Sequence, residues 1–161
     1  MSATGRSLER SPVRPSLKER CYMTAPLEEL ARQACQWVVY ADEDLVLAKH
    51  GLSLGEKAPL RLIAYHAQQC AEKYLKAYLV WKGIDFPYTH NIARLLELVG
   101  AQGPWVQELR DAARLTPFAI TARYPGEDSE VAREEAEQAI AIAESVRQTV
   151  RRALMAEGLK L

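Results

Sequence analysis

The residues best suited to chemistry lie on one predicted helix between Tyr65 and Ala77. Four polar side chains recur there at spacings of three, four and three residues: His66, Gln69, Lys73 and Lys76. Residues three and four apart share one face of an α-helix, so these side chains form a polar stripe. The stripe could hydrogen-bond a phosphate group or a base. A histidine at the edge of the core beside solvated lysines gives the same spacing, and spacing alone favours this structural interpretation.

Other reactive groups carry less information. Asp42, Glu43 and Asp44 are consecutive, so their side chains leave a helix in different directions. We interpret them as a solvated patch rather than as paired catalytic carboxylates. The three cysteines lie far apart without metal-ligand spacing. The sequence has no phosphate-binding glycine loop, no zinc-protease motif and no nucleophile elbow, and we predict neither a metal nor a cofactor.

A helical scaffold must position the polar stripe, and apolar periodicity predicts one along most of the chain. Apolar residues at spacings of three and four predict long helices over 27–49, 60–82 and 129–156. Shorter helices are predicted up to 99 and over 105–115, and residues 123–126 are predicted as a turn. Pro59 and Gly83 bound the second helix. Long amphipathic helices with short connections predict an all-α fold, an up-and-down bundle of four to five helices.

Composition and charge narrow the classes of function. Lys and Arg number 21 and Asp and Glu number 21, so the formal net charge is zero. Without a global basic excess, any nucleic-acid binding must rest on a local site. No apolar run approaches the ~20 residues that span a bilayer, and the N-terminus has no apolar signal core. Together with the unpaired cysteines, this predicts a cytoplasmic protein without membrane contact.

Residues 1–22 differ from the rest of the chain. They carry five basic and two acidic residues, a local charge of 5 − 2 = +3, together with Pro12 and Pro15. We predict a disordered basic N-terminal arm here, followed by a helical bundle domain over 23–158. The arm is either dispensable, or absent if translation starts at Met23. A basic tether for RNA or a targeting sequence is the alternative.

The second helix and the residues after it resemble the HEPN domain family. That family shows His-x-x-Gln-x-x-Glu-Lys-x-x-Lys-Ala on a helix, which matches residues 66–77 here. Gly-Ile or Gly-Val and then Thr-His-Asp/Asn follow in the family, and here these are residues 83–84 and 89–91. Arg123-Tyr124-Pro125 before the last helix matches as well. The resemblance covers about residues 27–154. The combination of these motifs is more specific to the family than any one motif alone.

The resemblance implies a helical bundle that is commonly a homodimer. Members often accompany a minimal nucleotidyltransferase encoded next door, as toxin–antitoxin or accessory pairs, and many others are metal-independent ribonucleases. The ribonucleases carry Arg, four to six residues and then His near the start of the last helix. This sequence departs from that motif, because Asp128, Ser129 and Glu130 follow Arg123 at the expected spacings. The chain contains no histidine after His90.

We therefore expect a HEPN binding module, dimeric, that engages nucleotide or RNA, or a nucleotidyltransferase partner. The expected ligand-binding groove is lined by His66, Gln69, Lys73, Lys76, His90 and Arg123. The alternative is a metal-independent endoribonuclease, which needs a base for the ribose 2′-hydroxyl and a cation for the phosphorane. Arg61 and His66 have the motif's spacing and are the candidate catalytic pair, although they lie on the second helix. A ligand-free oligomeric scaffold is the third hypothesis.

Overall fold

The structure is a computed structural model that describes residues 17–121 and 130–161. These residues form the α-helices α1 (Leu17–Leu52), α2 (Leu60–Trp81), α3 (Ile92–Gly100), α4 (Phe118–Thr121) and α5 (Arg133–Ala156). Two 3₁₀ segments, η1 (Gly55–Lys57) and η2 (Pro104–Leu115), complete the set. The predicted all-α bundle is confirmed. Residues 1–16 of the predicted arm and the predicted turn at 123–126 lie outside the described residues.

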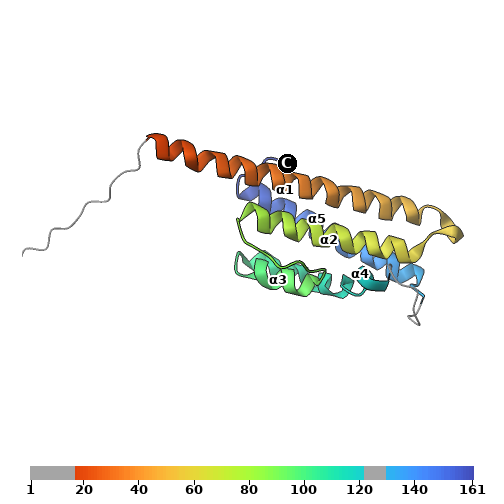
Figure 1. The fold of residues 1–161 in the computed structure, drawn as a ribbon. Helices are drawn as coiled ribbons and strands as arrows, with labels where there is room; N and C mark the ends of the chain where they lie inside the picture. The colour runs from red at the N-terminus through yellow and green to blue at the C-terminus, as the bar shows by residue number, and fades with distance from the viewer. Residues whose placement is uncertain (1–16, 122–129) are drawn as a thin grey trace, which may run out of the picture.

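Helix α2 occupies the centre of the bundle (Figure 1). It forms an antiparallel hairpin with α1, and α5 runs beside it in the same direction as α2. The shorter elements α3, η2 and α4 form a further layer against α2. Because α2 contacts all of these elements, more than half of its residues are buried. This central position decides the surroundings of every side chain in the predicted polar stripe.

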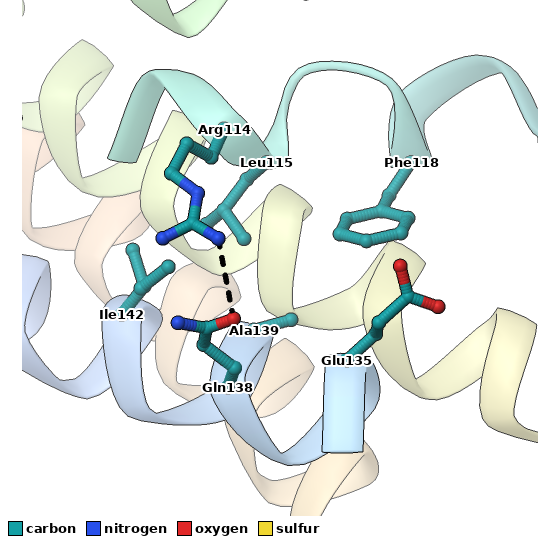
Figure 2. A pocket seen from close by; sticks show the side chains of 7 residues that line it. All are labelled: Arg114, Leu115, Phe118, Glu135, Gln138, Ala139 and Ile142. Atoms are coloured by element: carbon teal, nitrogen blue, oxygen red, sulfur yellow. Dashed lines mark hydrogen bonds between the residues drawn. The ribbon is translucent and has the colours of Figure 1, made fainter. Parts of the chain in front are cut away.

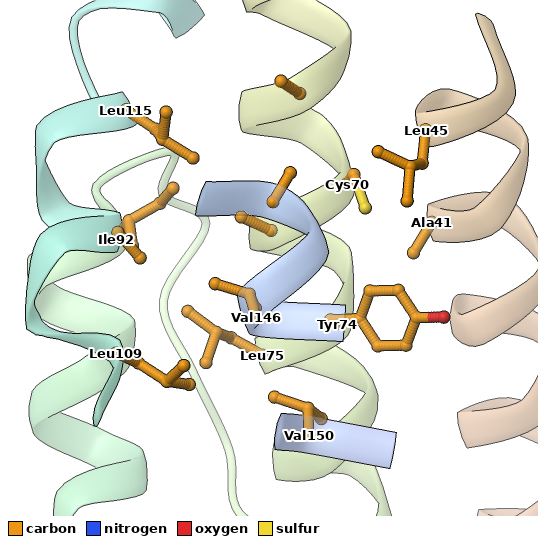
Figure 3. Packing of buried hydrophobic residues seen from close by; sticks show 14 of the residues in the cluster. Ala41, Leu45, Cys70, Tyr74, Leu75, Ile92, Leu109, Leu115, Val146 and Val150 are labelled. Carbon is orange, nitrogen blue, oxygen red and sulfur yellow. The ribbon is translucent and has the colours of Figure 1, made fainter. Parts of the chain in front are cut away.

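The core is built from the apolar stripes that the periodicity predicts. Ala34, Ala41 and Ala48 lie on one face of α1 and are fully buried, and α2 and α5 also bury alanines. These small side chains let the long helices approach closely. Larger side chains, among them Leu75 and Ile92, fill the space between α2 and the short elements (Figure 3).

Two predicted helix boundaries are confirmed in detail. Gly83 has φ +64° and ends α2, and the N–H of Ile84 donates to the carbonyl oxygen of Leu79 at 2.9 Å. This is the hydrogen bond of a Schellman cap, which glycine adopts without steric cost. Asn91 caps α3, because its side-chain oxygen accepts from the backbone N–H of Arg94 at 3.2 Å.

Other boundaries differ from the prediction. α1 begins at Leu17 rather than at residue 27, so Pro26 lies inside the helix and not in its first turn. Pro26 is exposed, so water can reach the carbonyl group that its missing N–H leaves unpaired. The predicted fourth helix is the 3₁₀ segment η2. α5 begins later than predicted, at Arg133, because the side chain of Glu135 accepts from the N–H of Ala132 at 2.8 Å.

Candidate functional site

Two residues of the predicted stripe, His66 and Lys73, meet at one carboxylate of α1. Nδ1 of His66 lies 2.8 Å from Oδ1 of Asp44. Nζ of Lys73 donates to Oδ2 of Asp44 at 2.5 Å. Asp44 is buried, so its assignment to a solvated patch is wrong. The sequence shows that Asp42 and Asp44 point in different directions, but it does not show that both directions lead to cationic partners.

The rest of the stripe gathers around Glu72, which is also buried. One carboxylate oxygen of Glu72 accepts from Nζ of Lys76 at 2.7 Å, and the other accepts from Nε2 of Gln68 at 2.8 Å. Nδ1 of His90, on the loop that returns from α2 to α3, lies 3.1 Å from the same carboxylate. Gln69 donates to the side-chain oxygen of Gln68 at 2.7 Å. We call Gln68, Glu72, Lys76 and His90 the Glu72 cluster.

The Glu72 cluster is an internal network. The Lys76 ammonium lies 5.7 Å from the centroid of the Trp37 ring and 5.6 Å from that of Phe86, within cation–π range. Lys76 and Gln69 are 6% and 8% exposed, so the prediction that they line a solvent-accessible groove is wrong. The reason is the central place of α2, which helical periodicity cannot reveal.

The predicted local excess of positive charge is also wrong for the two lysines. Lys73 is paired with Asp44 and Lys76 with Glu72. The two pairs together are neutral, as 2 − 2 = 0. His66 and Lys73 remain partly accessible, with 28% and 23% of their side chains exposed.

The candidate catalytic pair is not brought together by its helix. A spacing of five residues places Arg61 and His66 about 140° apart around the helix axis. His66 turns toward Asp44, whereas Arg61 is exposed. Arg123 lies outside the described residues, so its predicted place beside the stripe stays a prediction.

A second polar cluster, which the sequence interpretation missed, joins α1, α2 and α5. Oδ1 of Asp42 accepts from the Tyr74 hydroxyl at 2.5 Å and from Nε of Arg147 at 2.7 Å, and Oδ2 accepts from Arg151 at 3.3 Å. Burial, together with the hydrogen bond to Asp42, raises the pKa of the Tyr74 hydroxyl well above its ordinary value. The four-residue spacing of Arg147 and Arg151 on α5 was the available signal.

Large apolar side chains are exposed along the side of α1 that faces away from α2. We call Val39, Tyr40, Val46 and Leu47 the outer face of α1; they are 52%, 45%, 65% and 53% exposed. Two hollows flank this face. One, of about 240 Å³, is lined by Gln33, Gln36, Trp37 and Tyr40. The other, of about 340 Å³, lies between α1 and α5 and is lined by Asp42, Leu45, Val46, Lys49, Glu144, Arg147 and Gln148.

A smaller pocket lies between η2, α4 and α5 (Figure 2). It has a volume of about 110 Å³ and is lined by Arg114, Leu115, Phe118, Glu135, Gln138, Ala139 and Ile142. Among the described residues, no group of His, Cys, Asp or Glu is placed to hold a metal ion. Within the same ranges, no helix combines the length and the apolar character needed to cross a membrane.

Comparison with known proteins identifies a family and a solved structure that this chain resembles. The HEPN domain matches residues 34–153, which include α2, α3, about half of α1 and most of α5. The crystal structure of TT1696 from Thermus thermophilus is similar, with a TM-score of 0.59 and 26% sequence identity over 74% of this chain and 97% of that chain. No curated protein sequence gives a significant match. The match spans the residues that form the Asp44 and Glu72 contacts, and the chain belongs to the HEPN domain family.

Proposed function

We propose that this chain is a cytoplasmic HEPN binding module that forms a homodimer through the outer face of α1. We further propose that the dimer engages a nucleotide or a minimal nucleotidyltransferase, in line with the resemblance. The exposed apolar side chains of α1 carry this proposal. A helix at the surface of a monomer normally presents polar side chains opposite its buried stripe.

The shape of this surface suits a second copy of the same chain. Leu47 lies about 200° around the helix axis from the buried Leu45, so it points away from α2. The apolar outer face forms a ridge, and the two flanking hollows lie on either side of it. A ridge beside a hollow is self-complementary under two-fold symmetry, because each copy's ridge enters the other copy's hollow.

The dimer is tested by the mass of the chain in solution. At micromolar concentration, sedimentation equilibrium is expected to give the mass of two chains for the wild type and of one chain for Val46→Glu. Ile120→Glu is the matched control, because Ile120 is similarly exposed, at 63%, but lies on α4. A wild-type mass of one chain, or a Val46→Glu mass of two chains, would contradict the proposal.

The ribonuclease alternative is less well supported by the geometry. Arg61 and His66 diverge around α2, and the Nδ1 atom of His66 is engaged with Asp44. The two hypotheses separate in one assay, in which purified protein is incubated with RNA in EDTA. We expect no cleavage. Cleavage that His66→Ala or Arg61→Ala abolishes would favour the ribonuclease.

The ligand-free scaffold hypothesis differs from the binding-module hypothesis in one respect: it predicts neither a bound nucleotide nor a partner protein. Co-expression with the adjacent gene, followed by affinity purification, tests for a nucleotidyltransferase partner. A stable complex supports the module. If no complex forms and no nucleotide binds, the scaffold hypothesis is favoured.

A further inference from the structure

The pocket between η2, α4 and α5 combines an apolar floor with polar groups at its mouth. Glu135, Gln138 and Ile142 lie three and four residues apart, so they share the face of α5 that turns toward η2 and α4. Arg114 and Phe118 stand on the opposite side, at the two ends of the pocket, with Leu115 between them (Figure 2). A planar group entering the pocket would therefore lie between a guanidinium group and an aromatic ring.

The hydrogen bonds already present fix which polar atoms remain available. Oε2 of Glu135 accepts from the N–H of Ala132 at 2.8 Å, which leaves Oε1 as an acceptor without a partner among the described residues. The side-chain oxygen of Gln138 accepts from Nη2 of Arg114 at 3.3 Å (Figure 2). The Gln138 amide group, Nε2, is then left as a donor. The pocket thus presents one acceptor, from Glu135, and donors from Gln138 and Arg114.

We infer that this pocket binds a single pyrimidine base that carries an exocyclic amino group, which is the pattern of cytosine. The amino group of cytosine donates to a carboxylate and the neighbouring ring nitrogen accepts from an amide donor, while the Arg114 guanidinium lies against the face of the base. Aromatic rings and guanidinium planes are the usual neighbours of an unstacked base. Uracil fits worse, because it places a carbonyl oxygen where cytosine has the amino group, against Glu135.

The size of the pocket agrees with one base rather than a whole nucleotide. A volume of about 110 Å³ holds roughly eight waters, so ribose and phosphate would remain outside. This inference rests on the nucleotide-binding part of the proposed function and names the base. It does not depend on the outer face of α1, which lies on a different helix.

Titration of the full chain by NMR tests the inference. Cytidine is expected to shift the side-chain amide resonances of Gln138 and to bind about tenfold more tightly than uridine. A short oligocytidylate and an oligouridylate are titrated in parallel. If the oligocytidylate binds more tightly than cytidine, the molecule that supplies the base is single-stranded RNA. If the two bind equally, it is a free nucleoside or nucleotide. Equal affinity for cytidine and uridine, or no binding of either, would overturn the inference.

The variant Glu135→Gln makes the test specific. The glutamine oxygen can still accept from the N–H of Ala132, so the start of α5 is preserved. Its amide group then offers a donor where the carboxylate offered an acceptor. The preference for cytidine is expected to be lost, because the carbonyl oxygen of uridine gains a donor while its ring N–H still faces the donor of Gln138. Glu134→Gln, an exposed neighbour outside the pocket, is the matched control and should keep the preference for cytidine.

An unchanged preference in Glu135→Gln would refute the proposed hydrogen-bond pattern, even if cytidine binds. Phe118→Leu is expected to weaken both nucleosides together, because it removes the ring without changing the polar groups. Failure of this inference is distinguishable from failure of the dimer, since the mass of the chain in solution is measured separately. A two-chain mass with no response to cytidine removes the base site and leaves the dimer in place.

Discussion

Replacing Lys76 with alanine is expected to lower the free energy of unfolding by about 3 kcal/mol. The Lys76 side chain is 7% exposed and pairs with Glu72, whose side chain is 3% exposed. Removal of one partner of a buried ion pair leaves the other charge buried without compensation, which typically costs about 3–5 kcal/mol. We place the cost at the lower end because Glu72 keeps its contacts with Gln68 and His90.

Urea denaturation followed by circular dichroism measures this cost. For a chain of this size, about 3 kcal/mol corresponds to a fall of roughly 6–12 °C in melting temperature. Lys49→Ala is the matched control, because Lys49 and Glu144 also form a pair but are 51% and 37% exposed. An exposed pair contributes less than about 1 kcal/mol. Equal losses in Lys76→Ala and Lys49→Ala would refute the claim that burial makes the Lys76 pair important.

A double substitution separates the charge from the packing. Lys76→Met keeps an unbranched side chain between Trp37 and Phe86 but leaves Glu72 unpaired. Adding Glu72→Gln removes the buried charge and is expected to recover at least half of the loss, because removal of both partners costs less than removal of one. If Glu72→Gln deepens the loss instead, the packing of Lys76 rather than its charge is what stabilises the bundle.

Other consequences of burial and pairing are measurable on the same preparation. Asp44→Ala should lower the free energy of unfolding by about 2 kcal/mol in urea, because the Lys73 ammonium and the His66 ring both lose their carboxylate partner. Burial raises the pKa of the Cys70 thiol, so thiol alkylation should be slower at Cys70 than at Cys35 until the chain is denatured. The pKa of Tyr74 is raised in the folded state, so its contribution to stability is complete below pH ~10 and is lost as pH rises further; Tyr74→Phe should flatten this alkaline fall in melting temperature. Deletion of residues 1–22 should change the melting temperature by no more than a few degrees, since this segment lacks apolar periodicity and Ala34 is the first buried residue among the described side chains of α1.

The helices could be predicted where apolar periodicity and caps agree. The limits of α2 follow from Pro59 and Gly83, and Asn91 marks the start of α3. The prediction fails where one of these signals misleads. Pro26 resembles a first-turn proline but lies within α1, and the 3₁₀ geometry of η2 leaves no clear trace in the spacing of its apolar residues.

The partners of the polar residues could not be predicted from spacing. Periodicity identifies which side chains share a face of α2, but it does not show how many neighbours cover that face. Lys76 and Lys73 have the same spacing pattern, yet the first is buried between two rings and the second is partly exposed. Those differences depend on contacts across the sequence, such as the 18 residues that separate Glu72 from His90.

The residues that carry the family resemblance hold the bundle together. Glu72 and Lys76 pair with each other, His90 joins them from the next loop, and Asn91 caps α3. A buried polar network with its partners in place specifies how helices meet, and it does so whatever chemistry the surface performs. A chain can therefore keep this motif and still lack the histidine that a ribonuclease needs at the last helix. Function in this chain is then to be sought in residues that the motif leaves free to change, on the outer face of α1 and in the pocket beside α5.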